Sequence, residues 1–166
     1  DGQPLNELGA GGSPQAFDKG LAGLAMALAH SRGLFEYDER VSTYWPEFAQ
    51  HGKAQITVRQ LLSHQAGLFA LDERPVMSLV ADPDRLAIVL ARQQPAWPPG
   101  TRQAYHAITL GFYESELLRR VDPAHRTLGR FFQEELATPL GLDFYLRLPE
   151  EIPDSRLAPL SRPRHM

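Results

Sequence analysis

Apolar residues recur along most of the chain at the three- and four-residue spacing of one helix face. The first such segment begins at Ala16 and meets Gly33, a residue type that commonly ends a helix. A short apolar alternation, typical of a strand, occurs at residues 144–148. The pattern predicts a mainly α-helical chain, with helices over residues 16–31, 57–65, 84–93, 107–121 and 127–138.

Local signals refine the ends of these helices. Thr57 and Gln60 form the Thr-x-x-Gln pattern of a capping box at the start of the second helix. Asp82 or Asp84 is expected to cap the third helix, because a short oxygen-bearing side chain there can accept from the first free backbone N–H groups. Gly67 is expected to end the second helix.

The same periodicity predicts which side chains are buried. The first helix should bury Leu21, Leu24 and Leu28, and the fourth should bury Ile108 and Phe112. Trp45-Pro46 predicts an extended or turn conformation rather than helix, since a residue before proline is pushed out of the helical region.

Composition is that of one globular domain. The chain has 166 residues, of which 43% are hydrophobic and 22% charged, enough to bury a sizeable core. Residues 1–15 are rich in glycine and proline and predict an irregular segment, residues 16–151 predict the folded domain, and residues 152–166 predict a tail.

Charge and residue types exclude several functional classes. The formal charge of -3 provides no basic field for nucleic acid. With no cysteine and with six histidines outside any metal-binding spacing, we expect neither a metal nor another cofactor. No apolar run approaches the roughly 20 residues of a membrane span, and the first residues lack the features of a signal peptide, so we expect a soluble chain whose compartment stays open.

The segment 37–68, YDERVSTYWPEFAQHGKAQITVRQLLSHQAGL, carries a resemblance to a known family. It resembles the stretch that follows the nucleophile helix in serine hydrolases related to class C β-lactamases, which include D-alanyl-peptidases and esterases. Such proteins combine an antiparallel sheet with a helical part in an α+β fold. The resemblance covers residues 16–151 and implies that this chain is the nucleophile helix plus the helical part, without the sheet.

The first catalytic motif of that family is Ser-x-x-Lys, whose spacing puts hydroxyl and ammonium about 60° apart on a helix. The resemblance places Lys19 in the lysine position and Ala16 where the serine is expected. Ser13 is the alternative nucleophile, but six residues of helix would place it about 240° around from Lys19. An unwound first turn would be needed to bring Ser13 to Lys19.

The second motif, Tyr-x-Asn, corresponds to Tyr105-His106-Ala107 after a Pro-Gly turn. The resemblance implies that Tyr105 acts with Lys19 as general base and that His106 contacts the substrate. Ala107 in place of asparagine resembles the esterase branch more than true β-lactamases. The resemblance thus implies hydrolysis of a small ester or amide through an acyl-enzyme.

The third motif, a Lys-Thr-Gly or His-x-Gly strand, is missing from the sequence. Loss of one oxyanion donor costs on the order of 10²- to 10³-fold in kcat, and loss of the nucleophile costs more. Because Ala16 stands in the serine position as well, we expect the isolated chain to be inactive. Two hypotheses follow: an incomplete carboxylesterase-type hydrolase, or an inactive relative that serves as a binding or assembly module. We interpret His64 as a structural hydrogen-bonder, with a catalytic base as the alternative, and expect self-association through apolar side chains that a sheet would cover.

Overall fold

The periodic segments fold into helices in the computed structural model, which describes residues 14–73, 75–146, 148–149 and 151–156. Among these residues, sheet-type pairing is limited to an isolated antiparallel bridge between Arg40 and Thr57, and the described part of 144–148 forms no strand. In chain order the elements are α1 (Pro14–Ser31), α2 (Val41–Tyr44), η1 (Pro46–Ala49), α3 (Val58–Leu62), α4 (Met77–Val80), α5 (Pro83–Arg92), α6 (Thr109–Val121), α7 (Leu128–Phe132), η2 (Gln133–Ala137) and η3 (Asp154–Arg156).

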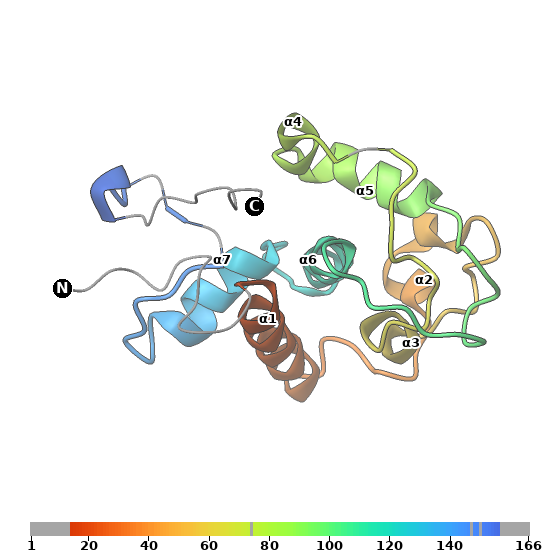
Figure 1. Ribbon diagram of the computed structural model, residues 1–166. Helices are drawn as coiled ribbons and strands as arrows, with labels where there is room; N and C mark the ends of the chain where they lie inside the picture. The colour runs from red at the N-terminus through yellow and green to blue at the C-terminus, as the bar shows by residue number, and fades with distance from the viewer. Residues whose placement is uncertain (1–13, 74, 147, 150, 157–166) are drawn as a thin grey trace.

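Helix α6 is the centre of the arrangement. It contacts α1 and α7 on one side and α2, α3 and α5 on the other, as Figure 1 shows. Tyr113, Leu117 and Leu118 of α6 are fully buried, and they belong to a single hydrophobic core cluster that draws side chains from both sides. The central helix therefore joins α1, which carries Lys19, to the elements that shape the Tyr105 loop.

The buried face of α1 differs from the predicted one. Ala22, Ala25, Met26 and Ala29 are buried, while Leu24 is 48% exposed, so the prediction for Leu24 was wrong. Leu21 and Leu28 are partly buried against the core. Small alanine side chains allow a close approach of α1 to α6 and α7, and this favours the alanine face over the leucine face.

The start of α6 was also placed too early. The helix begins at Thr109, and Ile108 lies before it with 60% of its surface exposed, so the predicted burial of Ile108 was wrong. The Thr109 hydroxyl donates to Leu68 O at 2.9 Å and is buried. This bond fixes Thr109 on the inward side, and its neighbour Ile108 consequently faces solvent.

The signals for the helix starts are confirmed, whereas the helix end expected at Gly67 is not. Thr57 and Gln60 form a complete capping box at α3, and Asp82 rather than Asp84 caps α5 by accepting from the backbone N–H of Arg85. Helix α3 ends at Leu62, so it is shorter than predicted, and the prediction that Gly67 ends it was wrong. The chain then turns at His64, whose φ of 64° lies in the left-handed region, before it reaches Gly67.

The turn predicted at Trp45-Pro46 separates two short helical elements. Helix α2 ends before Trp45, and η1 begins at Pro46, where the fixed φ of proline suits a first helical position. Trp45 and Phe48 are fully buried, and their rings lie 5.3 Å apart. Their burial, rather than helix propensity, accounts for the two helical turns that the sequence pattern did not predict.

Lys53 is fully buried and links the segment after η1 to α5. Its Nζ donates to Ala91 O at 2.8 Å and to Gln93 O at 2.5 Å, at the carboxyl end of α5. Free carbonyls at a helix end carry partial negative charge, so an ammonium suits this position. Burial lowers the pKa of Lys53 to about 8.

Within the described ranges, no helix combines the length and the apolar character that crossing a bilayer requires.

Candidate active site

Lys19 lies in the second turn of α1 and points to the loop that precedes α6. Its Nζ donates to Tyr105 Oη at 2.9 Å and to Ala107 O at 2.7 Å, and it lies 4.3 Å from the centroid of the Tyr105 ring. Two sequence motifs separated by 86 residues are thereby brought together. The expected close approach of Lys19 and Tyr105 is found in the structure.

The two candidate nucleophile positions precede Lys19. Ala16 lies in α1, three residues before Lys19 and so about 60° short of one full turn. Ser13 lies outside the described residues. The roles assigned to Ala16 and Ser13 stay predictions.

Tyr105 is held out of the core on a loop shaped by a Pro-Gly turn. Gly100 has a φ of 80°, and a side chain there would place its Cβ 2.9 Å from Gln60 Nε2. The position therefore suits glycine on both conformational and steric grounds. Tyr105 itself is 58% exposed, and its hydroxyl accepts from Lys19 at the surface of the chain.

His106, predicted to contact the substrate, is fully buried in this structure. Both of its ring nitrogens are buried without a hydrogen-bond partner among the described residues. Burial, then the charges of His64 and Lys19, lowers its pKa to about 4, so the ring is neutral at physiological pH. The substrate role of His106 stays a prediction.

His64 lies beside both residues of this loop. Its ring centroid is 5.0 Å from that of Tyr105 and 5.0 Å from that of His106, and its Nδ1 accepts from the backbone N–H of His106 at 3.2 Å. This bond agrees with the interpretation of His64 as a structural hydrogen-bonder.

Glu114 is a titratable residue that the sequence analysis did not single out. It is buried, and its Oε2 has no hydrogen-bond partner within the described part of the chain. Burial raises its pKa to about 7, while the charge of Lys19 opposes the rise. The signal was present in the sequence, because Glu114 stands on the α6 face that also carries Leu110, Leu117 and Leu118.

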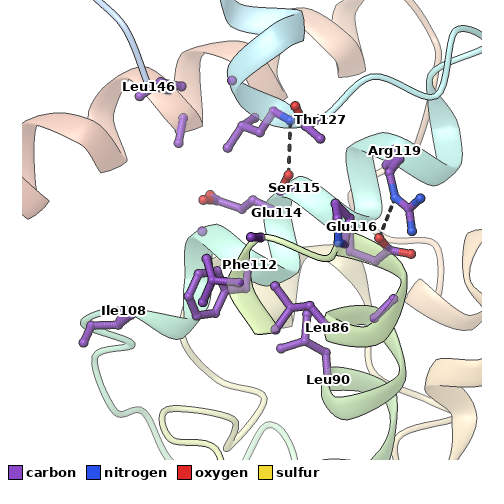
Figure 2. A pocket seen from close by; sticks show the side chains of 18 of the residues that line it. Leu86, Leu90, Ile108, Phe112, Glu114, Ser115, Glu116, Arg119, Thr127 and Leu146 are labelled. Atoms are coloured by element: carbon purple, nitrogen blue, oxygen red, sulfur yellow. Dashed lines mark hydrogen bonds and ion pairs between the residues drawn. The ribbon is translucent and has the colours of Figure 1, made fainter. Parts of the chain in front are cut away.

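A pocket of about 860 Å³ adjoins this group of residues. Figure 2 shows the Glu114 carboxyl among the side chains that line the pocket, with Phe112 and Leu146 nearby. Lys19 and Ala107 also contribute to the lining, so the pocket reaches the Lys19–Tyr105 pair. Most of the remaining lining is apolar, from α4, α5 and α7.

The arrangement has the parts of a proton-transfer pair. An ammonium in contact with a phenol oxygen stabilises the phenolate form, and a phenolate can take a proton from a nearby hydroxyl. In the described region of the chain, no group of three or more histidine, aspartate or glutamate side chains is arranged to hold a metal ion.

Comparison with known proteins places the chain among hydrolases. A family model described as Beta-lactamase matches residues 18–162. The esterase/beta-lactamase LipL of Mycobacterium tuberculosis (strain ATCC 25618 / H37Rv) is 32% identical over 186 aligned positions, which cover 99% of this chain and 41% of that protein.

Solved structures agree with this match. The crystal structure of a family VIII carboxylesterase is 42% identical with a TM-score of 0.79, over 85% of this chain and 38% of that one. A penicillin-binding protein homolog from Caulobacter crescentus is 40% identical with a TM-score of 0.80, over 90% of this chain and 39% of that one. The chain therefore spans about two-fifths of the length of the relatives that it matches.

Proposed function

We propose that this chain, which belongs to the beta-lactamase family of hydrolases, supplies the proton-transfer pair of a carboxylesterase-type serine hydrolase. The observation that carries the proposal is the 2.9 Å contact between Lys19 Nζ and Tyr105 Oη. Because the chain covers about two-fifths of its relatives, the activity of the whole protein belongs to the proposal as well.

In the proposed reaction, a serine hydroxyl attacks the ester carbonyl and its proton passes to Tyr105, whose phenolate form Lys19 stabilises. The carbon–oxygen bond to the leaving group breaks, and the departing alkoxide takes the proton from Tyr105. Water then attacks the acyl-serine, gives its proton through the same pair to the serine oxygen, and releases the carboxylic acid. The attacking serine is not supplied by Ala16, which has only a methyl group.

An ester is favoured over a β-lactam as substrate by Ala107. Its carbonyl accepts from Lys19, but its side chain offers no amide to a β-lactam side group. Two of the relatives are named as an esterase/beta-lactamase and a carboxylesterase, which supports the same choice.

The alternative is an inactive relative that acts as a binding or assembly module. Ala16 favours it, because without a nucleophile the Lys19–Tyr105 pair has no proton to accept.

The first experiment treats the chain with a fluorophosphonate serine probe and with a short-chain aryl ester. We expect neither labelling nor turnover, and we expect Ala16→Ser to restore little, because the strand that supplies the second oxyanion donor is missing from the sequence. Ser13→Ala is the matched control. Stoichiometric labelling that Ser13→Ala abolishes would make Ser13 the nucleophile and overturn the assignment.

The second experiment uses the product of the full coding region from the source organism. If it is a hydrolase, the probe should label one serine, and Tyr105→Phe should lower the labelling rate on the order of 10²-fold or more. Absence of labelling in a folded product would reject the hydrolase proposal and leave the binding module.

A further inference from the structure

The turn after α3 forms a platform for the loop that carries Tyr105. The carbonyl of His64 accepts from the backbone N–H of Ala104 at 3.2 Å, and the carbonyl of Gln65 accepts from the backbone N–H of Gly100 at 2.9 Å. One residue earlier in the turn, Ser63 O accepts from the side chain of Gln103 at 3.1 Å. Three successive residues of the turn thus bind the loop just before Tyr105.

The side chain of His64 adds a fourth contact with a distinct chemical requirement. Its Nδ1 lies 3.2 Å from the backbone nitrogen of His106, and a backbone N–H can only donate. Nδ1 must therefore be unprotonated, which places the single proton of the neutral ring on Nε2. The left-handed backbone of His64, with φ 64°, turns the chain so that both its carbonyl and its ring reach the loop.

We propose that His64 is a positioning residue whose neutral, Nε2-protonated ring holds the Tyr105–Ala107 segment against Lys19, and whose protonation releases that segment. The importance of this segment rests on the proposed function. The coupling itself concerns only the fold of the chain and is testable without activity.

The charges around His64 explain why protonation of its ring should release the loop. The charged and titratable groups around the ring are Lys19 on α1, and Tyr105 and His106 on the loop. Burial, then the charge of Lys19, lowers the pKa of His64 below its usual 6.5, so the ring is neutral at physiological pH. When it takes a second proton, Nδ1–H faces the N–H of His106, the bond is lost, and two cations face each other across the loop.

The test follows an isotope-labelled sample of the chain by nuclear magnetic resonance from pH 7.5 to pH 4.5. At pH 7.5 we expect the ring nitrogens of His64 to show the Nε2–H tautomer. On acidification the backbone amide signals of Ala104 to Ala107 should shift with the midpoint of the His64 ring, below pH 6.5. An Nδ1–H tautomer, or loop amides that follow a different midpoint, would overturn the proposal.

A pair of variants separates the ring contact from the backbone. Asparagine and glycine both accept a left-handed φ, but only the Asn side chain offers an oxygen near the Nδ1 position. We expect His64→Asn to keep the close contact of Lys19 with Tyr105, seen as a nuclear Overhauser effect, and to remove its pH dependence. His64→Gly should weaken that contact at every pH. Equal contact in both variants would reject a positioning role for the ring, whatever the outcome of the activity experiments.

Discussion

Two buried titratable side chains near Lys19 have pKa values shifted in opposite ways. Burial lowers the pKa of His106 to about 4 and raises that of Glu114 to about 7. Both shifts favour the neutral form, because a charge without a partner is costly in a buried site. The ammonium of Lys19 is therefore held among neutral groups near pH 6, which leaves its hydrogen bonds to Tyr105 and Ala107 as its main polar contacts in the described structure.

His106 should make the fold sensitive to acid. Its folded-state pKa lies below the unfolded value of about 6.5, so the unfolded chain binds more protons and stability falls as pH drops from 6.5 to 4. The size of this pKa shift limits the loss in the free energy of unfolding from His106 to roughly 3 kcal/mol. We expect His106→Leu to remove most of this acid-dependent loss, measured by urea unfolding at pH 7 and pH 4.5. His51→Asn, at an exposed left-handed position, is the control and should keep the wild-type slope.

Glu114 should show the opposite dependence. Its folded-state pKa is above the unfolded value, so its contribution is present below about pH 4.5 and is lost as pH rises through 7. Glu114→Gln should be more stable than wild type by roughly 1–3 kcal/mol at pH 8.5 and nearly equal at pH 4.5. A Glu114→Gln variant destabilised at both pH values would show that the carboxylate has a partner.

At the residue scale, the sequence predicted the contact of Lys19 with Tyr105 but not the burial of the titratable residues around it. The contact of Lys19 with Tyr105 was expected, because two motifs define those positions. The burial of His106 was not expected, because no periodic pattern marks the loop position that it occupies. Glu114 stands on the apolar face of α6, which indicates burial, but glutamate is rarely buried without a partner, so the residue type argued against the pattern.

Among the elements, α3 shows how a short helix depends on its cap. It has only Val58–Leu62, too few residues to be stable alone, yet it positions the turn that supports the Tyr105 loop. Thr57→Ala removes the side-chain acceptor and should lower stability by about 1 kcal/mol in urea unfolding. Gln55→Ala, an exposed position two residues earlier, should change stability by much less. An equal loss in both variants would contradict the importance of the cap.

The longer helices were predicted because their apolar period extends over several turns, as in α5 and α6. The predicted face of α1 was partly wrong because periodicity alone does not weigh leucine against alanine, and close packing on α6 and α7 selected Ala22, Ala25 and Ala29. Helix α4 was not predicted, since it has a single turn and only Leu79 of its residues is buried.

At the scale of the whole molecule, several large apolar side chains remain in solvent. They include Leu24 at 48%, Ile108 at 60% and Met77 at 80% exposure, on or beside α1, α6 and α4. Apolar groups left open in this way favour association when they form a patch of more than a few hundred Å². We therefore propose that the chain self-associates.

Sedimentation velocity over a range of concentrations tests this proposal. We expect a concentration-dependent increase in mean mass, which Leu24→Glu should reduce. Gln55→Glu, at an exposed polar position, is the comparison for added charge alone. A clean monomer at high concentration, with no binding of a dye for apolar surface, would count against association.

The burial of Lys53 makes the reactivity of its amine a measure of whether the chain is folded. The sequence has two lysines, and they differ in access, because Lys19 is partly exposed while Lys53 is sealed beneath the end of α5. An amine-reactive reagent should modify Lys19 in the native chain and reach Lys53 only after urea opens the fold, as peptide mass spectrometry would show. Equal modification of both without urea would mean that the fold is not formed. An esterase assay on the same sample completes the comparison. If the chain is inactive but only Lys19 is modified, it is folded and lacks a catalytic group; if both lysines are modified, it is unfolded.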